Sequence, residues 1–149
     1  MTERQALIAR KRAMQAARNR ARRLEGVAVA AFLEDGENPR LDRCWREHSR
    51  AFYNGRPVSR LHYRSSREEV QAWLLENLRL GEGDGFFYRI GSVWAEIRIL
   101  DPPAAVRSLW EERDVLLIAA DFRRILGAGF DSRDEEHFLI DLLPLPPDG

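Results

Sequence analysis

The sequence has little cysteine, little lysine and no long apolar segment. Its one cysteine, Cys44, cannot form a disulfide within the chain, so nothing points to an oxidising compartment. The longest apolar run, Val27 to Leu33, has seven residues, whereas a helix needs about 20 to cross a bilayer. Basic residues run through the N-terminal segment from Arg4 to Arg23, which is not the pattern of a signal peptide. We therefore expect a cytoplasmic protein without a membrane span.

The 149 residues are enough for one domain with its own core. Hydrophobic residues make up 44% of the chain, which excludes a disordered protein because enough apolar surface exists to offset the ordering entropy. The net charge is zero, yet residues 1–64 sum to +8 and residues 65–149 to −8. Either the two halves neutralise each other within the fold, or each faces a different partner. Lys11 is the single lysine, and this arginine bias suggests a GC-rich bacterial genome.

The N-terminal segment predicts a basic helix with a narrow apolar stripe, which begins at Glu3 and contains strong helix formers as far as Leu24. We favour its continuation past Gly26 to about Leu33 over a break at Gly26 followed by a short buried piece. Residues 1–33 are then either an extension or a part of the domain. Residues 34–149 form a single α+β domain in this interpretation.

Capping signals predict two further helices. Asn38 followed by a proline starts a helix over 40–53. Ser66 and Glu69 form a capping box that starts the next helix. Gly81 is placed where a left-handed closing residue is expected.

From residue 86 the hydrophobic period changes from 3.6 to 2, which indicates strands. Runs over 86–90 and 93–99 flank Gly91-Ser92, which suits a two-residue hairpin. A helix is expected after Asp101, then strands over 115–119, 124–126 and 137–143, with a turn at 127–129 and a short strand over 61–63. The hairpin register pairs Ile90 with Val93, Tyr88 with Ala95, Phe86 with Ile97 and Arg89 with Trp94. The fold class is α+β, with N-terminal helices followed by a mainly antiparallel sheet that one helix interrupts.

The sequence predicts no catalytic residue, metal or cofactor. The glycine-rich segment 81–85 runs from a helix into a strand and holds two carboxylates, the reverse of a phosphate loop, and no helix follows the glycines at 127–129. Cys44 and His48 could share a helical face as a nucleophile and its base, or form half a zinc site with His62. However, Cys44 falls on an apolar stripe, which is typical of a core residue. We therefore expect a binding protein rather than an enzyme.

Two acidic segments are candidates for a contact surface. Residues 131–137 form the densest acidic cluster, either a solvated turn between two strands or a surface for a protein partner. Residues 111–114 end a helix, where acidic side chains oppose the helix dipole. A small stability cost of that kind favours a use outside the fold.

The basic N-terminal helix is a candidate for contact with a phosphate backbone. It has no aromatic residue for base stacking, so its arginines can equally be solvated, paired with the acidic half, or directed at an acidic protein. The narrow apolar stripe allows the helix to pack on its own domain or on a second copy of the chain. The alternative function is therefore a nucleic-acid-associated regulator acting through Arg10, Lys11, Arg12, Arg18, Arg20, Arg22 and Arg23.

The segments DVLLIAADFRRILG (114–127) and FLID (138–141) resemble those of the small immunity proteins with which bacteria neutralise polymorphic toxins. Such proteins act by occlusion, so the resemblance implies a toxin inhibitor that places an acidic surface over a cationic active site. Charge complementarity of this kind chiefly sets association rate and specificity. The residues expected to contact a toxin are Asp131, Asp134, Glu135 and Glu136, with Glu111, Glu112 and Asp114 as second choice.

Overall fold

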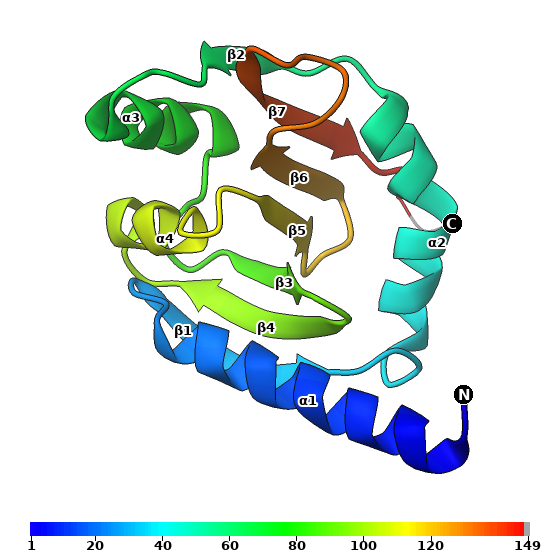
Figure 1. Cartoon of the computed structure of the whole chain (residues 1–149). Coiled ribbons are helices and arrows are strands. Elements are labelled where there is room, and N and C mark those ends of the chain that lie inside the picture. Colours follow the sequence, from blue (N-terminus) through cyan, green and yellow to red (C-terminus); the bar gives the residue numbers. More distant parts are fainter. Residues whose placement is uncertain (148–149) are drawn as a thin grey trace.

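The computed structural model describes residues 1–147 and has the α+β fold that the sequence predicts (Figure 1). The described part of the chain forms four helices and seven strands. In chain order these are α1 Glu3–Arg22, β1 Val27–Leu33, α2 Pro39–Asn54, β2 Ser59–His62, α3 Arg67–Leu78, β3 Gly85–Ile90, β4 Val93–Ile99, α4 Pro102–Leu109, β5 Val115–Ala119, β6 Arg124–Gly129 and β7 His137–Pro144.

The strands form one antiparallel sheet in the order β1-β4-β3-β5-β6-β7-β2. Helices α3 and α4 cover one face, α2 covers the other, and α1 runs along the β1–β4 end (Figure 1). Each face has its own core because successive side chains of a strand point to opposite faces. Phe86 and Tyr88 join the core under α3 and α4, whereas Phe87 and Trp94 join the core under α2.

Local capping explains where the helices begin. Asn38 caps α2, and Ser66 and Glu69 form the expected capping box of α3. The closing residue of α3 is Arg79, with φ 52°, and not Gly81 as the sequence predicted. The amide of Gly81 instead donates to the Asp84 carboxylate at 2.9 Å, so the loop before β3 closes on itself.

The predicted hairpin of β3 and β4 is confirmed residue by residue, including the pair Arg89 and Trp94. Gly91 has φ +59°, as the first position of a tight hairpin turn requires. The Arg89 guanidinium lies 4.9 Å from the Trp94 ring centroid, a cation–π contact on the α2 face of the sheet. The hairpin is therefore fixed both by its turn and by a cross-strand pair.

The prediction that the first helix continues to Leu33 is wrong, because α1 ends at Arg22 and Val27–Leu33 is strand β1. Gly26 has φ +71°, and a Cβ atom there would lie 2.5 Å from the Asp101 carbonyl oxygen. The Gly26 carbonyl accepts hydrogen bonds from the amides of Leu100 and Asp101. Pairing with β4 thus overrides a helical apolar stripe.

The predicted turn at 127–129 is also wrong, because these residues complete strand β6. A Cβ atom on Gly127 would lie 2.6 Å from the Val115 carbonyl oxygen and 3.1 Å from the Phe52 ring. The glycine therefore serves close packing between β5 and α2 rather than a change of chain direction.

None of the helices in residues 1–147 is long and apolar enough to cross a bilayer.

Candidate functional site: an arginine-lined groove

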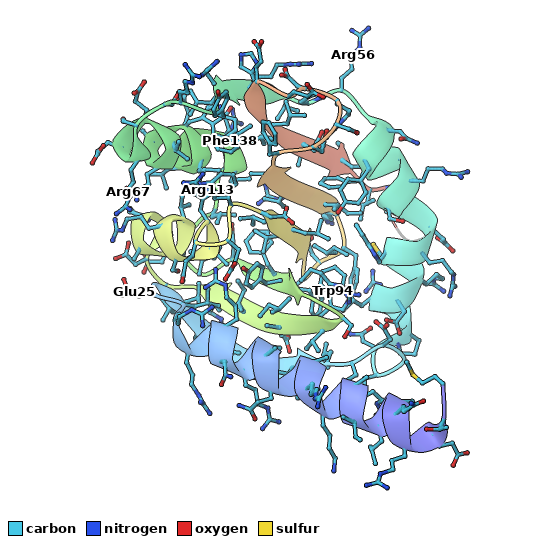
Figure 2. The ribbon with its side chains drawn as sticks, viewed as in Figure 1. Glu25, Arg56, Arg67, Trp94, Arg113 and Phe138 are labelled. Atoms are coloured by element: carbon cyan, nitrogen blue, oxygen red, sulfur yellow. The ribbon has the colours of Figure 1, made fainter. Side chains whose placement is uncertain are left out.

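A groove of about 700 Å³ lies on the face of the sheet that α3 and α4 cover. It extends from the α1–β1 junction past the end of α4 to the start of α3, and Figure 2 labels Glu25, Arg67, Arg113 and Phe138 along it. Residues from six helices, strands or connecting loops line the groove. The groove is therefore formed by the tertiary fold and not by one sequence motif. The lining residues are Arg23, Glu25, Tyr63, Ser65, Arg67, Val70, Gln71, Arg107, Ser108, Trp110, Glu111, Arg113 and Phe138.

Three arginines of the groove, Arg67, Arg107 and Arg113, are exposed and make no ion pair or side-chain hydrogen bond with the described residues. They come from the start of α3, from α4 and from the turn before β5. Arg23 differs, because its guanidinium pairs with Glu111 at 3.2 Å and with Glu112 at 3.4 Å. Three cationic groups are thus available to an anionic ligand.

Tyr63, Trp110 and Phe138 line the groove beside these arginines, and Phe130 adjoins them outside its lining. Trp110 and Phe138 pack edge to face with their centroids 5.2 Å apart. Phe138 also contacts Phe130, whose centroid lies 6.4 Å from that of Tyr63. Phe130 and Tyr63 are 49% and 41% exposed. Arginine with tryptophan and tyrosine is the composition typical of the energetically important residues of protein interfaces.

Arg113 adopts a left-handed backbone with φ 57°, and its amide donates to the Trp110 carbonyl at 2.8 Å. This tight turn joins the end of α4 to β5 and places Arg113 at the groove. A residue with a Cβ atom pays a conformational cost in this region that glycine does not.

Buried Arg20 of α1 holds the end of α4 in position. Its Nη2 donates to the Ser108 carbonyl at 2.6 Å and to the Tyr88 hydroxyl at 3.2 Å, and its Nη1 pairs with Glu111 at 3.2 Å. Burial raises the pKa of the Tyr88 hydroxyl, which Arg20 partly opposes, so Tyr88 stays neutral. The polar wall of the groove at α4 is therefore anchored in the core.

The acidic cluster at 131–137 is largely neutralised by its own neighbours. Arg133 forms ion pairs with Asp131 and with buried Asp141, both at 2.6 Å. Its side-chain hydrogen bond lowers the pKa of Asp131. Asp134 accepts from the Glu136 amide and contacts His137 and Arg60, which lower its pKa to about 2.

Glu135 and Glu136 remain exposed, and neither side chain bonds to another described residue. Of the second predicted set, Glu111 pairs with Arg20 of α1, and both Glu111 and Glu112 pair with Arg23, the residue that follows α1. Asp114 is exposed overall, but partial desolvation of its side chain raises the pKa of the carboxyl group.

The charges of both acidic segments act on Tyr53 of α2. Burial raises the pKa of this hydroxyl, and the charges of Asp114, Asp141 and Asp131 raise it further.

The basic residues of α1 do not form one free cationic face. Arg20 is buried, Arg10 pairs with Glu34 at 2.8 Å, and Arg18 lies 5.8 Å from the Phe32 ring. Arg22 donates to Asn19, and Lys11 and Arg12 are exposed without a bond to a described side chain.

Cys44 of α2 is buried in the core between this helix and the sheet, together with Leu41 and Phe52 of the same helix. Within residues 1–147 no group of three or more His, Cys, Asp or Glu side chains could hold a metal ion. A nucleophile at Cys44 would therefore lie inside the apolar core instead of in the groove.

Sequence reasoning missed the groove. Arg23 and Glu111 were candidate residues for other surfaces, and the remaining arginines and aromatic residues come from separate segments, so no single stretch is rich in them. One signal was present, because Arg107, Trp110 and Arg113 recur every third residue and so lie near one face of a helix and its closing turn.

No protein-family model, curated protein or solved structure matches this chain.

Proposed function

We propose that the chain is a non-enzymatic binding protein whose arginine-lined groove holds an acidic segment of a partner protein. The observation that carries this proposal is the presence of three arginines, unpaired among the described residues, beside aromatic rings. Aromatic rings bury apolar parts of a ligand, while guanidinium groups bind carboxylates in bidentate geometry. The two together favour a segment that combines carboxylates with an apolar side chain.

An immunity-type inhibitor, as the sequence resemblance implies, stays a prediction within this proposal. The sequence predicted an acidic surface on this chain and a cationic target. The groove favours the opposite arrangement, in which arginines of this chain contact an acidic region of the target. The expected acidic surface now rests mainly on Glu135 and Glu136, because Asp131 and Asp134 are engaged inside their own loop.

The test measures binding of a fluorescein-labelled peptide of Asp and Glu with one central Phe by fluorescence anisotropy. Charge reversal at three groove arginines, Arg67→Glu, Arg107→Glu and Arg113→Glu together, is expected to weaken binding at least tenfold, about 1.4 kcal/mol.

The matched control reverses three exposed cations of α1 outside the groove, as Arg4→Glu, Lys11→Glu and Arg12→Glu together. Both triple variants change the net charge equally. The control therefore separates the effect of the position of the arginines from the effect of net charge. It is expected to change peptide affinity less than twofold. Equal weakening by both triple variants contradicts a groove site.

Duplex DNA, titrated across a salt series, tests the alternative. Salt-dependent DNA binding that only the α1 variant abolishes would favour the nucleic-acid-associated regulator and contradict the proposal.

A further inference from the structure

The outer surface of α2 carries a stripe of three exposed arginines, Arg43, Arg46 and Arg50. None of them forms an ion pair or a side-chain hydrogen bond with a described residue. Their spacing of three and four residues places them on one face of the helix. The opposite face packs on the sheet through Leu41 and Phe52, and α2 lies on the outside of the molecule (Figure 1). The α2 stripe is therefore open to a partner.

The exposed residues of α2 between positions 40 and 50 are all charged. They are four arginines and one glutamate, namely Arg40, Arg43, Arg46, Glu47 and Arg50. Protein interfaces derive most of their binding energy from aromatic and other large side chains at the centre of the contact. The groove has such side chains beside its arginines, whereas this surface does not. A partner with repeated negative charge is therefore favoured over a protein.

A hollow of about 550 Å³ lies at the start of the α2 stripe. It is lined by Gly36, Pro39, Arg40, Asp42, Arg43 and Arg46. The Asp42 carboxylate accepts a hydrogen bond from the Gly36 amide at 2.8 Å, which ties the preceding loop to the helix. Arg43 and Arg46 belong both to the hollow and to the stripe, so anionic groups that follow one another can occupy the two together.

The length of the stripe matches the charge repeat of duplex DNA. Arg43 and Arg50 are seven residues apart, which is about 10 Å along a helix axis. One strand of the duplex carries a phosphate about every 3.4 Å along its axis, so this length holds about three phosphates. Guanidinium groups bind phosphate oxygens in bidentate geometry. Single strands are instead held by stacking of bases on aromatic rings, and none is exposed between positions 40 and 50.

We propose that the α2 stripe binds the phosphate backbone of duplex DNA. Because phosphate contacts carry no sequence information, the affinity should not depend on base sequence. The inference is independent of the proposed groove, since no residue of α2 lines the groove and α2 covers the opposite face of the sheet (Figure 1). It also differs from the sequence-based alternative, which placed nucleic acid on α1.

The test measures binding of the intact chain to a fluorescein-labelled DNA duplex of mixed sequence by anisotropy across a salt series. Three phosphate contacts predict a slope of about −2.7 for the logarithm of the binding constant against that of salt concentration. The triple variant Arg43→Gln, Arg46→Gln and Arg50→Gln is expected to weaken binding about tenfold or more at low salt. Arg46→Gln alone should reduce the slope by about one. Circular dichroism checks that both variants keep the fold.

The matched control replaces three exposed arginines of the groove, as Arg67→Gln, Arg107→Gln and Arg113→Gln together. It changes the net charge by the same amount and should alter DNA affinity less than about twofold. A second control replaces three exposed cations of α1, as Arg4→Gln, Lys11→Gln and Arg12→Gln together.

Three outcomes overturn the proposal. The first is DNA binding that is absent or independent of salt. The second is equal weakening by the α2 variant and a control variant, or weakening by the α1 variant alone. The third is tighter binding of an acidic peptide than of DNA, lost only in the α2 variant, which would assign the stripe to a protein partner.

Discussion

Among residues 1–147, the non-glycine residues Arg79, Arg113 and Phe122 have positive φ values, and a left-handed backbone costs about 1 kcal/mol for a residue with a Cβ atom. Arg79 closes α3, and Phe122 packs against the Phe87 ring with centroids 5.7 Å apart. Arg113 has no comparable packing of its side chain among the described residues and lines the groove. Arg113 therefore combines a strained backbone with a position in the groove.

Replacement of this residue should separate stability from binding. Arg113→Gly is expected to raise the free energy of unfolding by about 1 kcal/mol, because glycine adopts the left-handed region without strain. It should also weaken binding of the acidic peptide. Arg79→Gly is the control, since it relieves the same strain outside the groove and should leave peptide affinity unchanged. Urea denaturation and anisotropy measure the two effects, and a loss of stability in Arg113→Gly contradicts this account.

Most elements of this fold could be predicted from local signals. These signals include the caps at Asn38 and Ser66 and the alternation on either side of Gly91. Each of them acts within a few residues, so it can be recognised in the sequence. Strand β1 could not be predicted in this way, because its pairing partner β4 lies about seventy residues further along the chain. Long-range pairing decided between helix and strand for a segment whose apolar spacing fits both.

The junction between α1 and β1 depends on Gly26. Gly26→Ala is expected to lower the free energy of unfolding by more than about 3 kcal/mol, because a Cβ atom combines positive φ with contacts of 2.5 and 2.6 Å to backbone atoms. Gly36→Ala is the matched control, since Gly36 has φ +91° but open space around it. It should cost only about 1 kcal/mol. Thermal or urea denaturation compares the two variants, and equal costs would mean that conformation and not crowding matters at Gly26.

The stability of the whole molecule should depend on the carboxylates of the β6–β7 loop. The pKa of Asp134 is lowered from 3.8 to about 2, first by the Glu136 amide and then by His137. Because the folded pKa is the lower one, its stabilisation is fully present above about pH 4 and is lost as pH falls towards 2. The variant Asp134→Asn should therefore be less stable than the unaltered chain at pH 5 and should lose less stability between pH 4 and pH 2.

The control is Glu135→Gln, because the Glu135 side chain makes no bond within the described residues. Its stability should follow the pH dependence of the unaltered chain in urea denaturation. An unchanged pH dependence in Asp134→Asn would show that the Asp134 contacts do not stabilise the fold.

At the scale of the molecule, charge along the chain does not translate into charge on a surface. The groove takes Arg23 from the basic half and Arg67, Arg107 and Arg113 from the acidic half. Conversely, buried Arg20 and exposed Arg23 neutralise Glu111 across 88 or more positions of sequence. The acidic and basic segments could be identified from the sequence, but which charges remain unpaired depends on tertiary contacts that no local pattern encodes.

The single lysine has a practical consequence. Lys11 is exposed on α1 and does not line the groove, so amine-reactive dyes can attach only there and at the N-terminal amino group, which starts the same helix. Dye at these two amines therefore reports on α1 and leaves the groove arginines unmodified.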